Sequence, residues 1–285
     1  MTQSITPLFA QCPLAVVPVR SRPDHRSEQR TQLLFGEIVH VLQAGKVWTR
    51  IRCPWDQMEG WVMAGQLLAC SSERVEEEFA YSLEICQPAV SRRGALPIPF
   101  GARLPGFDGL RFRLGEESYQ YSGQAVAPDV LEPYADLVMK LARRYLGAPY
   151  QWGGRSPFGI DAAGFVQLIF QLVDIPLPRT AAAQVLLGEE VDFVQRALPG
   201  DIAFFGPANG TVDHVGILLP GEELLHVEEQ VRIDKVDHQG IFNERRQRYT
   251  RPLRVVRRVL PTEERAYRKR TRRAAGSGRQ FELFG

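Results

Sequence analysis

The stretch WGGRSPFGIDAAGF, Trp152 to Phe165, has the composition of a catalytic loop that leads into a helix. A nucleophile in such a loop lies best in the first turn of the helix, where unpaired backbone N–H groups and the helix dipole lower the pKa of a thiol. Ala162 occupies this position and Ala163 follows it, and neither side chain can attack a carbonyl. The sequence therefore predicts the entrance to an active site without its reactive atom.

Two histidines could supply the base and the orienting group that a cysteine nucleophile needs. His214 lies in VDHVGILL and His226 in ELLHVEE, two strand candidates joined by a turn at Pro220-Gly221. A connecting loop with an odd number of residues places both side chains on the same face of an antiparallel pair. We therefore predict a three-residue loop at 220–222 and histidines that are diagonal neighbours, about 7–8 Å apart at the backbone.

The residues around the loop also have structural interpretations. An acidic residue just before a helix is a good N-cap, so Asp161 could cap the helix, line the site, or do both. Trp152, Arg155 and the two glycines between them could form only a tight turn, yet glycine beside tryptophan also lets a backbone approach a peptide. Tyr150 could hydrogen-bond near the nucleophile position or simply pack. We favour the interpretation that these residues line the wall of the active site.

Helices followed by strands are predicted to position these groups. Apolar residues at helical spacing mark one helix that the Gly147-Ala148-Pro149 turn ends, and a second helix that begins at about Ala162. A third, short helix is expected from Thr180 to Leu187. Three strand candidates follow the turn at Pro199-Gly200, namely IAFFG, DHVGILLP and ELLHVEE. This order is typical of the α+β class.

The N-terminal part of the chain has the pattern of β-structure. From about Pro13 to Leu68, short runs alternate apolar and polar residues between turns, which predicts a small all-β barrel. A weaker set of runs from about Ala80 to Ala127 predicts a second, diverged barrel, followed by a linker at Pro128 to Pro133. We therefore expect three domains and a basic tail, with the boundaries 1–70, 71–130, 131–260 and 261–285.

Composition restricts the function classes. The chain has 285 residues, a formal net charge of +2 and an ordinary hydrophobic fraction of 44%, so a multi-domain globular protein is expected. The sequence shows neither a run of eighteen uncharged apolar residues nor a basic, apolar leader, so we expect neither membrane insertion nor secretion. Four cysteines without a CxxC pair favour a reducing cytoplasm over a disulfide framework or a zinc site.

For three minor features we favour interpretations that involve no specific ligand or partner. Basic residues crowd positions 265–273, where a solvated tail is favoured over a nucleic-acid-binding arm. The stretch from Gln280 to Phe284 is similar to short peptides that dock into bacterial sliding clamps, but so short a pattern often occurs by chance. The Asp-His pairs at 213–214 and 237–238 lack the spacing of a metal site, so we expect no metal and no cofactor.

Several stretches together resemble one family. YLGAPYQWGGRSPFGIDAAGFVQLIFQL, IPLPRTAAAQ, LPGDIAFF, DHVGILL and LLHV resemble, in order and spacing, the NlpC/P60 cell-wall cysteine peptidases, over roughly Tyr134 to Arg258. QLLFGEIVHVL and MEGWV are similar to the bacterial SH3 modules of gamma-D-glutamyl-L-diamino acid endopeptidases. The resemblance implies SH3-like barrels before a papain-like α+β domain. It also implies cleavage of murein stem peptides between D-glutamate and the diamino acid, in small peptides with a free amino end.

The resemblance also implies a role for each site residue. The family loop Asp-Cys-Ser-Gly-Phe aligns with residues 161–165, so the nucleophile falls at Ala162 and a substrate-binding serine at Ala163. His214 becomes the base and His226 the group that orients it.

Two positions in the first barrel are implied to contact the substrate. In relatives, a tyrosine just before EGW often helps to hold the free amino end of the substrate, and Met58 stands there in this chain. Glu37 remains as a possible carboxylate for that amine.

Two interpretations of Ala162 stay open. An experimenter could have replaced a cysteine, which the retained histidines and Asp161 favour, and this interpretation is preferred. Alternatively, a natural pseudoenzyme binds muropeptides as a sensor or scaffold, which the further losses at Ala163 and Met58 favour. A scaffold recruited through the basic tail ranks third. In each case the sequence predicts that no acyl-enzyme forms at this loop.

Overall fold

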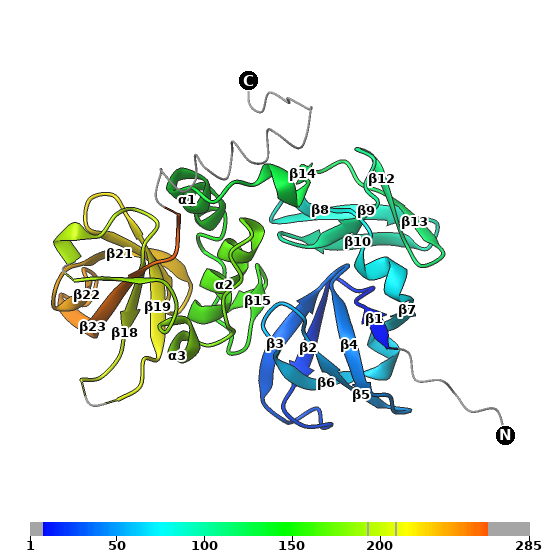
Figure 1. Ribbon diagram of the computed structural model, residues 1–285, viewed down its shortest axis with the longest axis horizontal. Helices are drawn as coiled ribbons and strands as arrows, with labels where there is room; N and C mark the ends of the chain where they lie inside the picture. Colours follow the sequence, from blue (N-terminus) through cyan, green and yellow to red (C-terminus); the bar gives the residue numbers. More distant parts are fainter. Residues whose placement is uncertain (1–7, 193, 209, 262–285) are drawn as a thin grey trace.

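The computed structural model of the chain describes residues 8–192, 194–208 and 210–261, and it consists of two β units and one α+β unit (Figure 1). The stretch Gln280 to Phe284 and the basic tail from residue 262 onward lie outside the described residues. None of the helices in the described ranges has the length and apolar character that crossing a bilayer would require.

The first β unit is an antiparallel sheet of seven strands around a small core. The strands are β1 (Phe9–Gln11), β2 (Val16–Arg20), β3 (Gln29–Leu34), β4 (Ile38–Gln43), β5 (Trp48–Arg52), β6 (Glu59–Met63) and β7 (Leu68–Cys70). Their order in the sheet is β3-β2-β6-β5-β4-β1-β7. Every second residue of β2 and β6 is buried, because successive side chains of a strand point to opposite faces. Short 3₁₀ helices follow at Ala64–Gln66 and Ser72–Val75.

The second β unit contains two smaller sheets. Its strands are β8 (Phe79–Ser82), β9 (Cys86–Ser91), β10 (Gly94–Pro99), β11 (Arg103–Pro105), β12 (Arg111–Leu114), β13 (Glu117–Gln120) and β14 (Ala125–Val126). One sheet has the order β10-β9-β13-β12 and the other β11-β8-β14. A 3₁₀ helix at Pro128–Val130 leads out of the unit.

The two β units share a tight contact. Phe35 of the first unit packs edge-on against Phe112 of the second, with ring centroids 5.5 Å apart. The next residue, Gly36, has φ of +78°, and a Cβ there would lie 1.9 Å from the carbonyl oxygen of Arg103. Only glycine fits this close approach, so Phe35 and Gly36 hold the first β unit against the second.

Three α-helices begin the C-terminal unit. They are α1 (Ala135–Arg143), α2 (Ala162–Leu172) and α3 (Ala181–Gln184), and a hairpin of β15 (Arg155–Ser156) and β16 (Gly159–Ile160) precedes α2. Figure 1 shows α2 between the C-terminal strands and the first β unit. Nine of its eleven residues are buried, because it packs on both α1 and the sheet. The predicted start of this helix at about Ala162 is confirmed.

An antiparallel sheet completes the C-terminal unit. Its strands are β17 (Glu189–Val191), β18 (Ile202–Phe205), β19 (His214–Leu219), β20 (Glu223–Val227), β21 (Val231–Val236), β22 (Gly240–Asn243) and β23 (Arg248–Arg258), with a 3₁₀ helix at Val194–Arg196. The order is β17-β23-β18-β19-β20-β21-β22, and an additional pairing of β23 with β22 closes the last six into a ring. The three predicted strands are present as β18, β19 and β20. The other four were not predicted. β17, β21 and β23 are rich in charged residues and partly exposed, and β22 is a run of only four residues, GIFN.

Candidate active site

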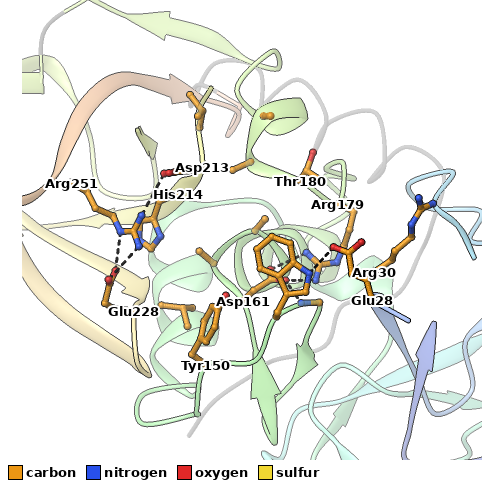
Figure 2. Close-up of a pocket in the computed structure, with 18 of the residues that line it drawn as sticks. Glu28, Arg30, Tyr150, Asp161, Arg179, Thr180, Asp213, His214, Glu228 and Arg251 are labelled. Atoms are coloured by element: carbon orange, nitrogen blue, oxygen red, sulfur yellow. Dashed lines mark hydrogen bonds and ion pairs between the residues drawn. The ribbon is translucent and has the colours of Figure 1, made fainter. Parts of the chain in front are cut away.

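A pocket of about 940 Å³ lies where the C-terminal unit meets the first β unit (Figure 2). Figure 2 shows Glu28 and Arg30, from the first β unit, at one end of the pocket and His214 and Arg251 at the other. Asp161, directly before α2, lies between the two ends. Four acidic and three basic side chains line the pocket, namely Glu28, Asp161, Asp213, Glu228, Arg30, Arg179 and Arg251.

Ala162 lines this pocket as the first residue of α2, with 8% of its surface exposed. The helix begins here because Asp161 has an extended backbone and its Oδ1 accepts the N–H of Gly164 at 2.7 Å. Asp161 therefore both caps the helix and lines the pocket. A nucleophile at position 162 would stand at the positive end of the helix, but the methyl group of alanine cannot attack.

His214 and His226 form a hydrogen-bonded pair on adjacent strands. A three-residue loop at 220–222 joins β19 and β20, and His226 lies opposite Gly216, two residues from His214. The predicted loop length and diagonal placement are thus confirmed. His214 Nε2 lies 2.9 Å from His226 Nδ1, and both residues are buried. Of the two, His214 lines the pocket together with Ala162.

Asp234 of β21 extends this pair into a chain of three groups. His226 Nε2 lies 3.1 Å from Asp234 Oδ2, and Arg232 Nη2 donates to the other carboxylate oxygen at 2.6 Å. Burial alone would raise the pKa of Asp234, but the hydrogen bonds from His226 and Arg232 lower it below its ordinary value. When a neutral His226 donates its Nε2 proton to the ionised carboxylate, its Nδ1 is an acceptor and His214 Nε2 is the donor. His214 Nδ1 is then left unprotonated, as a base requires.

The surroundings of His214 keep its ring neutral. Burial is the largest cause, and the neighbouring His226 and Arg251 add to it, so the pKa of His214 lies well below 6.5. A histidine with a low pKa has its lone pair free at neutral pH. The geometry therefore suits a base at His214 with His226 as its orienting group, and it adds Asp234 behind them.

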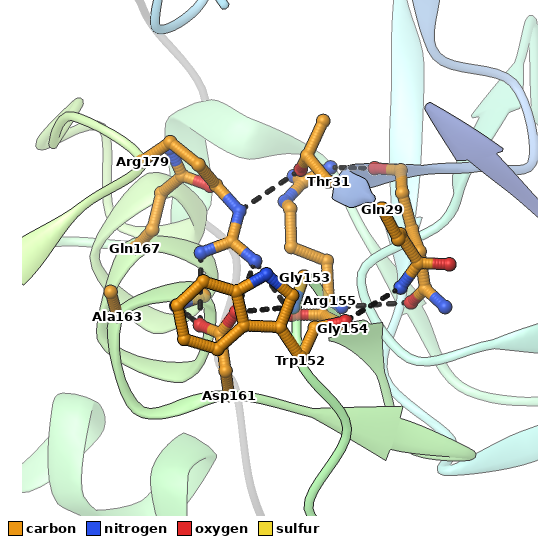
Figure 3. A network of polar contacts seen from close by, with 12 residues as sticks. Gln29, Thr31, Trp152, Gly153, Gly154, Arg155, Asp161, Ala163, Gln167 and Arg179 are labelled. Carbon is orange, nitrogen blue, oxygen red and sulfur yellow. Dashed lines mark hydrogen bonds and ion pairs between the residues drawn. The ribbon is translucent and has the colours of Figure 1, made fainter. Parts of the chain in front are cut away.

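Arg179 connects Asp161 to the first β unit (Figure 3). Its Nη1 and Nη2 donate to the Asp161 carboxylate at 2.9 and 2.6 Å, and its Nε donates to Thr31 Oγ1 at 3.1 Å. The Asp161 carboxylate also accepts the backbone N–H of Gly153 at 2.8 Å. These contacts, with the helix cap, hold the carboxylate in one orientation beside the nucleophile position.

The structure places Glu37 and Arg155 away from the pocket, in contrast to the predicted substrate contacts. Arg155 is fully buried, and its Nη1 and Nη2 donate to the Glu37 carboxylate at 3.0 and 2.9 Å. Arg155 Nη1 also donates to the carbonyl of Gln32 and Nη2 to the side chain of Gln171. Glu37 is therefore engaged as the partner of a buried guanidinium that joins the two units, and it cannot receive an amine from a ligand.

The remaining predicted contacts, Tyr150, Trp152, Met58 and Ala163, all line the pocket. Trp152 is 63% exposed, and its indole Nε1 donates to Glu28 Oε1 at 2.9 Å. Glu28, in the loop before β3, is thus an exposed carboxylate that the first β unit brings to this end of the pocket.

Sequence reasoning missed Asp234, Arg179, Glu28 and Arg251. Asp234 could have been found from the sequence, because it is an acidic residue in VRIDKV, the run directly after the strand that carries His226. Arg179 lies in IPLPRTAAAQ, one of the stretches that carry the family resemblance, but its contacts with Asp161 and Thr31 join distant segments. No local pattern marks Glu28 or Arg251.

Three potential metal ligands, His214, His226 and Glu228, have donor atoms within 4.8 Å of one another. The facing nitrogens of the histidines are hydrogen-bonded to each other, and Glu228 is bound by Arg251. These side chains are therefore already engaged with protein partners. This geometry favours a proton relay over an ion site.

Two family models match the chain. The NlpC/P60 family model matches residues 147–251, which include the helix loop and the histidine strands, and the bacterial dipeptidyl-peptidase Sh3 domain model matches residues 19–67. The chain carries an NlpC/P60 domain behind a bacterial SH3 domain. The expected class, SH3-like β units followed by an α+β NlpC/P60 domain, is thereby confirmed.

This NlpC/P60 protein aligns with known proteins over most of its length. It is 26% identical over 213 residues to the gamma-D-glutamyl-L-lysine dipeptidyl-peptidase of Bacillus subtilis, covering 69% of this chain and 71% of that protein. The protein of the same name from Bacillus cereus is 25% identical over 243 residues, covering 75% and 72%. The crystal structure of an NlpC/P60 family protein from Bacillus cereus shares the fold, with a TM-score of 0.76 and 21% identity over 89% of this chain and all of that one. The chain is therefore homologous to proteins of the peptidoglycan peptidase family.

Proposed function

We propose that this NlpC/P60 protein binds a murein stem peptide of the form L-Ala-gamma-D-Glu-diamino acid and does not cleave it. The observation that carries the proposal is Ala162, in the first turn of α2 and in the same pocket as His214. The peptide class comes from the relatives, which are named gamma-D-glutamyl-L-lysine dipeptidyl-peptidases. Because position 162 has no nucleophilic atom, the bound peptide is not converted into an acyl-enzyme there.

The charges near the SH3 domain match a peptide with a free amino end. Glu28 offers an exposed carboxylate, held by Trp152, to which the ammonium group of the first residue can bind. Asp161 offers a second carboxylate on the α2 side, which pairs with Arg179 but, unlike Glu37, lines the pocket and keeps 15% of its side chain exposed. Arg30 lines the same end and provides a cation for a peptide carboxylate.

The structure also bears on the origin of the alanine. The relay from His214 through His226 to Asp234 has complete hydrogen bonds, although it serves no chemistry without a nucleophile. An intact relay favours the removal of a cysteine from an otherwise complete site, by engineering or recently in evolution. In the alternative, a natural pseudoenzyme that acts as a sensor or scaffold, the relay is kept only for its structural role.

Calorimetric titration of the chain with L-Ala-gamma-D-Glu-diamino acid tripeptides tests the proposal. We expect saturable binding, and mass spectrometry should recover the peptide intact. The N-acetylated peptide is the matched control. Its affinity should be lower by at least about tenfold, because it lacks the ammonium group that binds Glu28 and Asp161. Absence of binding to any stem peptide, or release of a dipeptide by the unmodified chain, would contradict the proposal.

A further inference from the structure

We infer that the end of the pocket beside His214 selects a diamino acid whose side chain ends in both an ammonium and a carboxylate group, as in meso-diaminopimelate, over lysine. The inference rests on the proposed function, which supplies the class of peptide and its direction. It concerns the residue on the carboxyl side of the gamma-D-glutamyl bond.

Three charged side chains, here called the distal cluster, form this end of the pocket. They are Asp213, Glu228 and Arg251 (Figure 2). Arg251 Nε and Nη2 donate to the Glu228 carboxylate at 2.9 and 3.2 Å, and Nη1 lies 3.4 Å from Asp213 Oδ1. Asp213 directly precedes His214, Glu228 directly follows β20, and Arg251 lies on β23. The strands that position the histidines therefore also position the cluster.

The place of the cluster fits the residue after the gamma-D-glutamyl bond. Figure 2 shows Glu28 at the SH3 end, the distal cluster at the opposite end and Asp161 between them. A peptide whose amino end binds Glu28 has two residues, L-Ala and D-Glu, before the bond that would lie at Ala162. Its third residue, the diamino acid, then continues toward Arg251 and its two carboxylate partners.

The cluster carries both signs of charge, and all three side chains are within reach of a ligand. The side chains of Asp213, Glu228 and Arg251 are 55%, 24% and 30% exposed. The guanidinium has five N–H donors, and three bonds to Glu228 and Asp213 leave donors free for a carboxylate of the ligand. The two carboxylates can at the same time accept an ammonium group.

The guanidinium decides between the two diamino acids. The net charge of the cluster, −1, attracts the ammonium group of lysine and of meso-diaminopimelate alike. A lysine side chain leaves the free donors of Arg251 without a partner and brings a like charge close to them. A side chain with both groups pairs its carboxylate with Arg251 and its ammonium with Asp213 or Glu228, so both signs are matched.

The test compares two tripeptides, L-Ala-gamma-D-Glu-meso-diaminopimelate and L-Ala-gamma-D-Glu-L-Lys, by calorimetric titration of the whole chain. We expect the first to bind at least about tenfold more tightly, as a charge-assisted contact predicts. Arg251→Gln should remove this preference. Arg257→Gln is the matched control, because Arg257 lies on the same strand with similar exposure but pairs with Glu190 outside the pocket, and it should keep the preference.

Each outcome decides one point. Equal affinities, or tighter binding of the lysine peptide, would overturn the inference and leave the proposed function standing. A preference that persists in a folded Arg251→Gln variant would overturn the assignment to Arg251. Failure of both peptides to bind would overturn the proposed function itself, and the inference with it.

Discussion

Truncation of Glu37 should destabilise the SH3 domain and its contact with the NlpC/P60 domain by about 3–5 kcal/mol, the usual cost of leaving a buried charge without its partner. Arg155 is fully buried, and Glu37 binds both of its terminal nitrogens. Burial alone would lower the pKa of Arg155, but Glu37 raises it above its ordinary value, so the guanidinium stays charged. In Glu37→Ala the guanidinium would keep only neutral hydrogen-bond acceptors, the carbonyl of Gln32 and the side chain of Gln171.

Urea unfolding, followed by tryptophan fluorescence, measures this loss. Trp55 is a suitable reporter, because the Arg155 guanidinium lies 5.0 Å from its ring centroid. Glu223→Ala, which removes the exposed pair with Lys235, is the control and should cost less than about 1 kcal/mol. The double variant Glu37→Ala with Arg155→Met should recover part of the loss, because the unpaired charge is gone. A loss below about 1 kcal/mol in Glu37→Ala, or a double variant no more stable than the single one, would refute this reasoning.

Three further predictions follow from the relay and the domain contact. The folded state holds His214 neutral with a pKa well below 6.5, so the unfolded chain binds more protons below that pH. The free energy of unfolding should therefore fall as the pH drops below about 6.5, by at most about 1.4 kcal/mol per pH unit, and His214→Phe should flatten this slope in pH-dependent urea titrations. In an Ala162→Cys background, Asp234→Asn should lower kcat at least about 100-fold with little change in KM. The introduced amide would donate to His226 Nε2, which reverses the tautomers of both histidines and places a proton on His214 Nδ1. An unchanged kcat would show that Asp234 does not position the histidine pair. Gly36→Ala should destabilise the contact of the β units, since its Cβ would lie 1.9 Å from a carbonyl oxygen of the second unit, and unchanged thermal unfolding would contradict this.

Local patterns were sufficient to predict the parts of the site that depend on neighbouring residues. The acidic cap at Asp161 fixes the start of α2, and the three-residue loop fixes the register that joins His214 to His226. Both follow from backbone geometry over a few residues. The positions of the nucleophile and of the histidine pair could therefore be derived before the structure.

Contacts between distant segments could not be derived in the same way. Glu37 has the residue type of an amine-binding group, but 118 positions separate it from Arg155, the partner that occupies it. Arg179 reaches Thr31 across 148 positions, and the sequence does not show which side chains meet when the domains pack. The charged strand β23 was missed because its side chains are only partly buried, so its apolar alternation is weak.

The most direct test of the central claim is hydrolysis by the Ala162→Cys variant. The chain, its Ala162→Cys variant and the same variant with His214→Ala should each be incubated with L-Ala-gamma-D-Glu-meso-diaminopimelate, and the products identified by mass spectrometry. If the nucleophile is the one missing part of a complete site, Ala162→Cys releases the dipeptide L-Ala-D-Glu, while the other two leave the peptide intact. A folded Ala162→Cys variant that binds the peptide and releases no product would contradict this account.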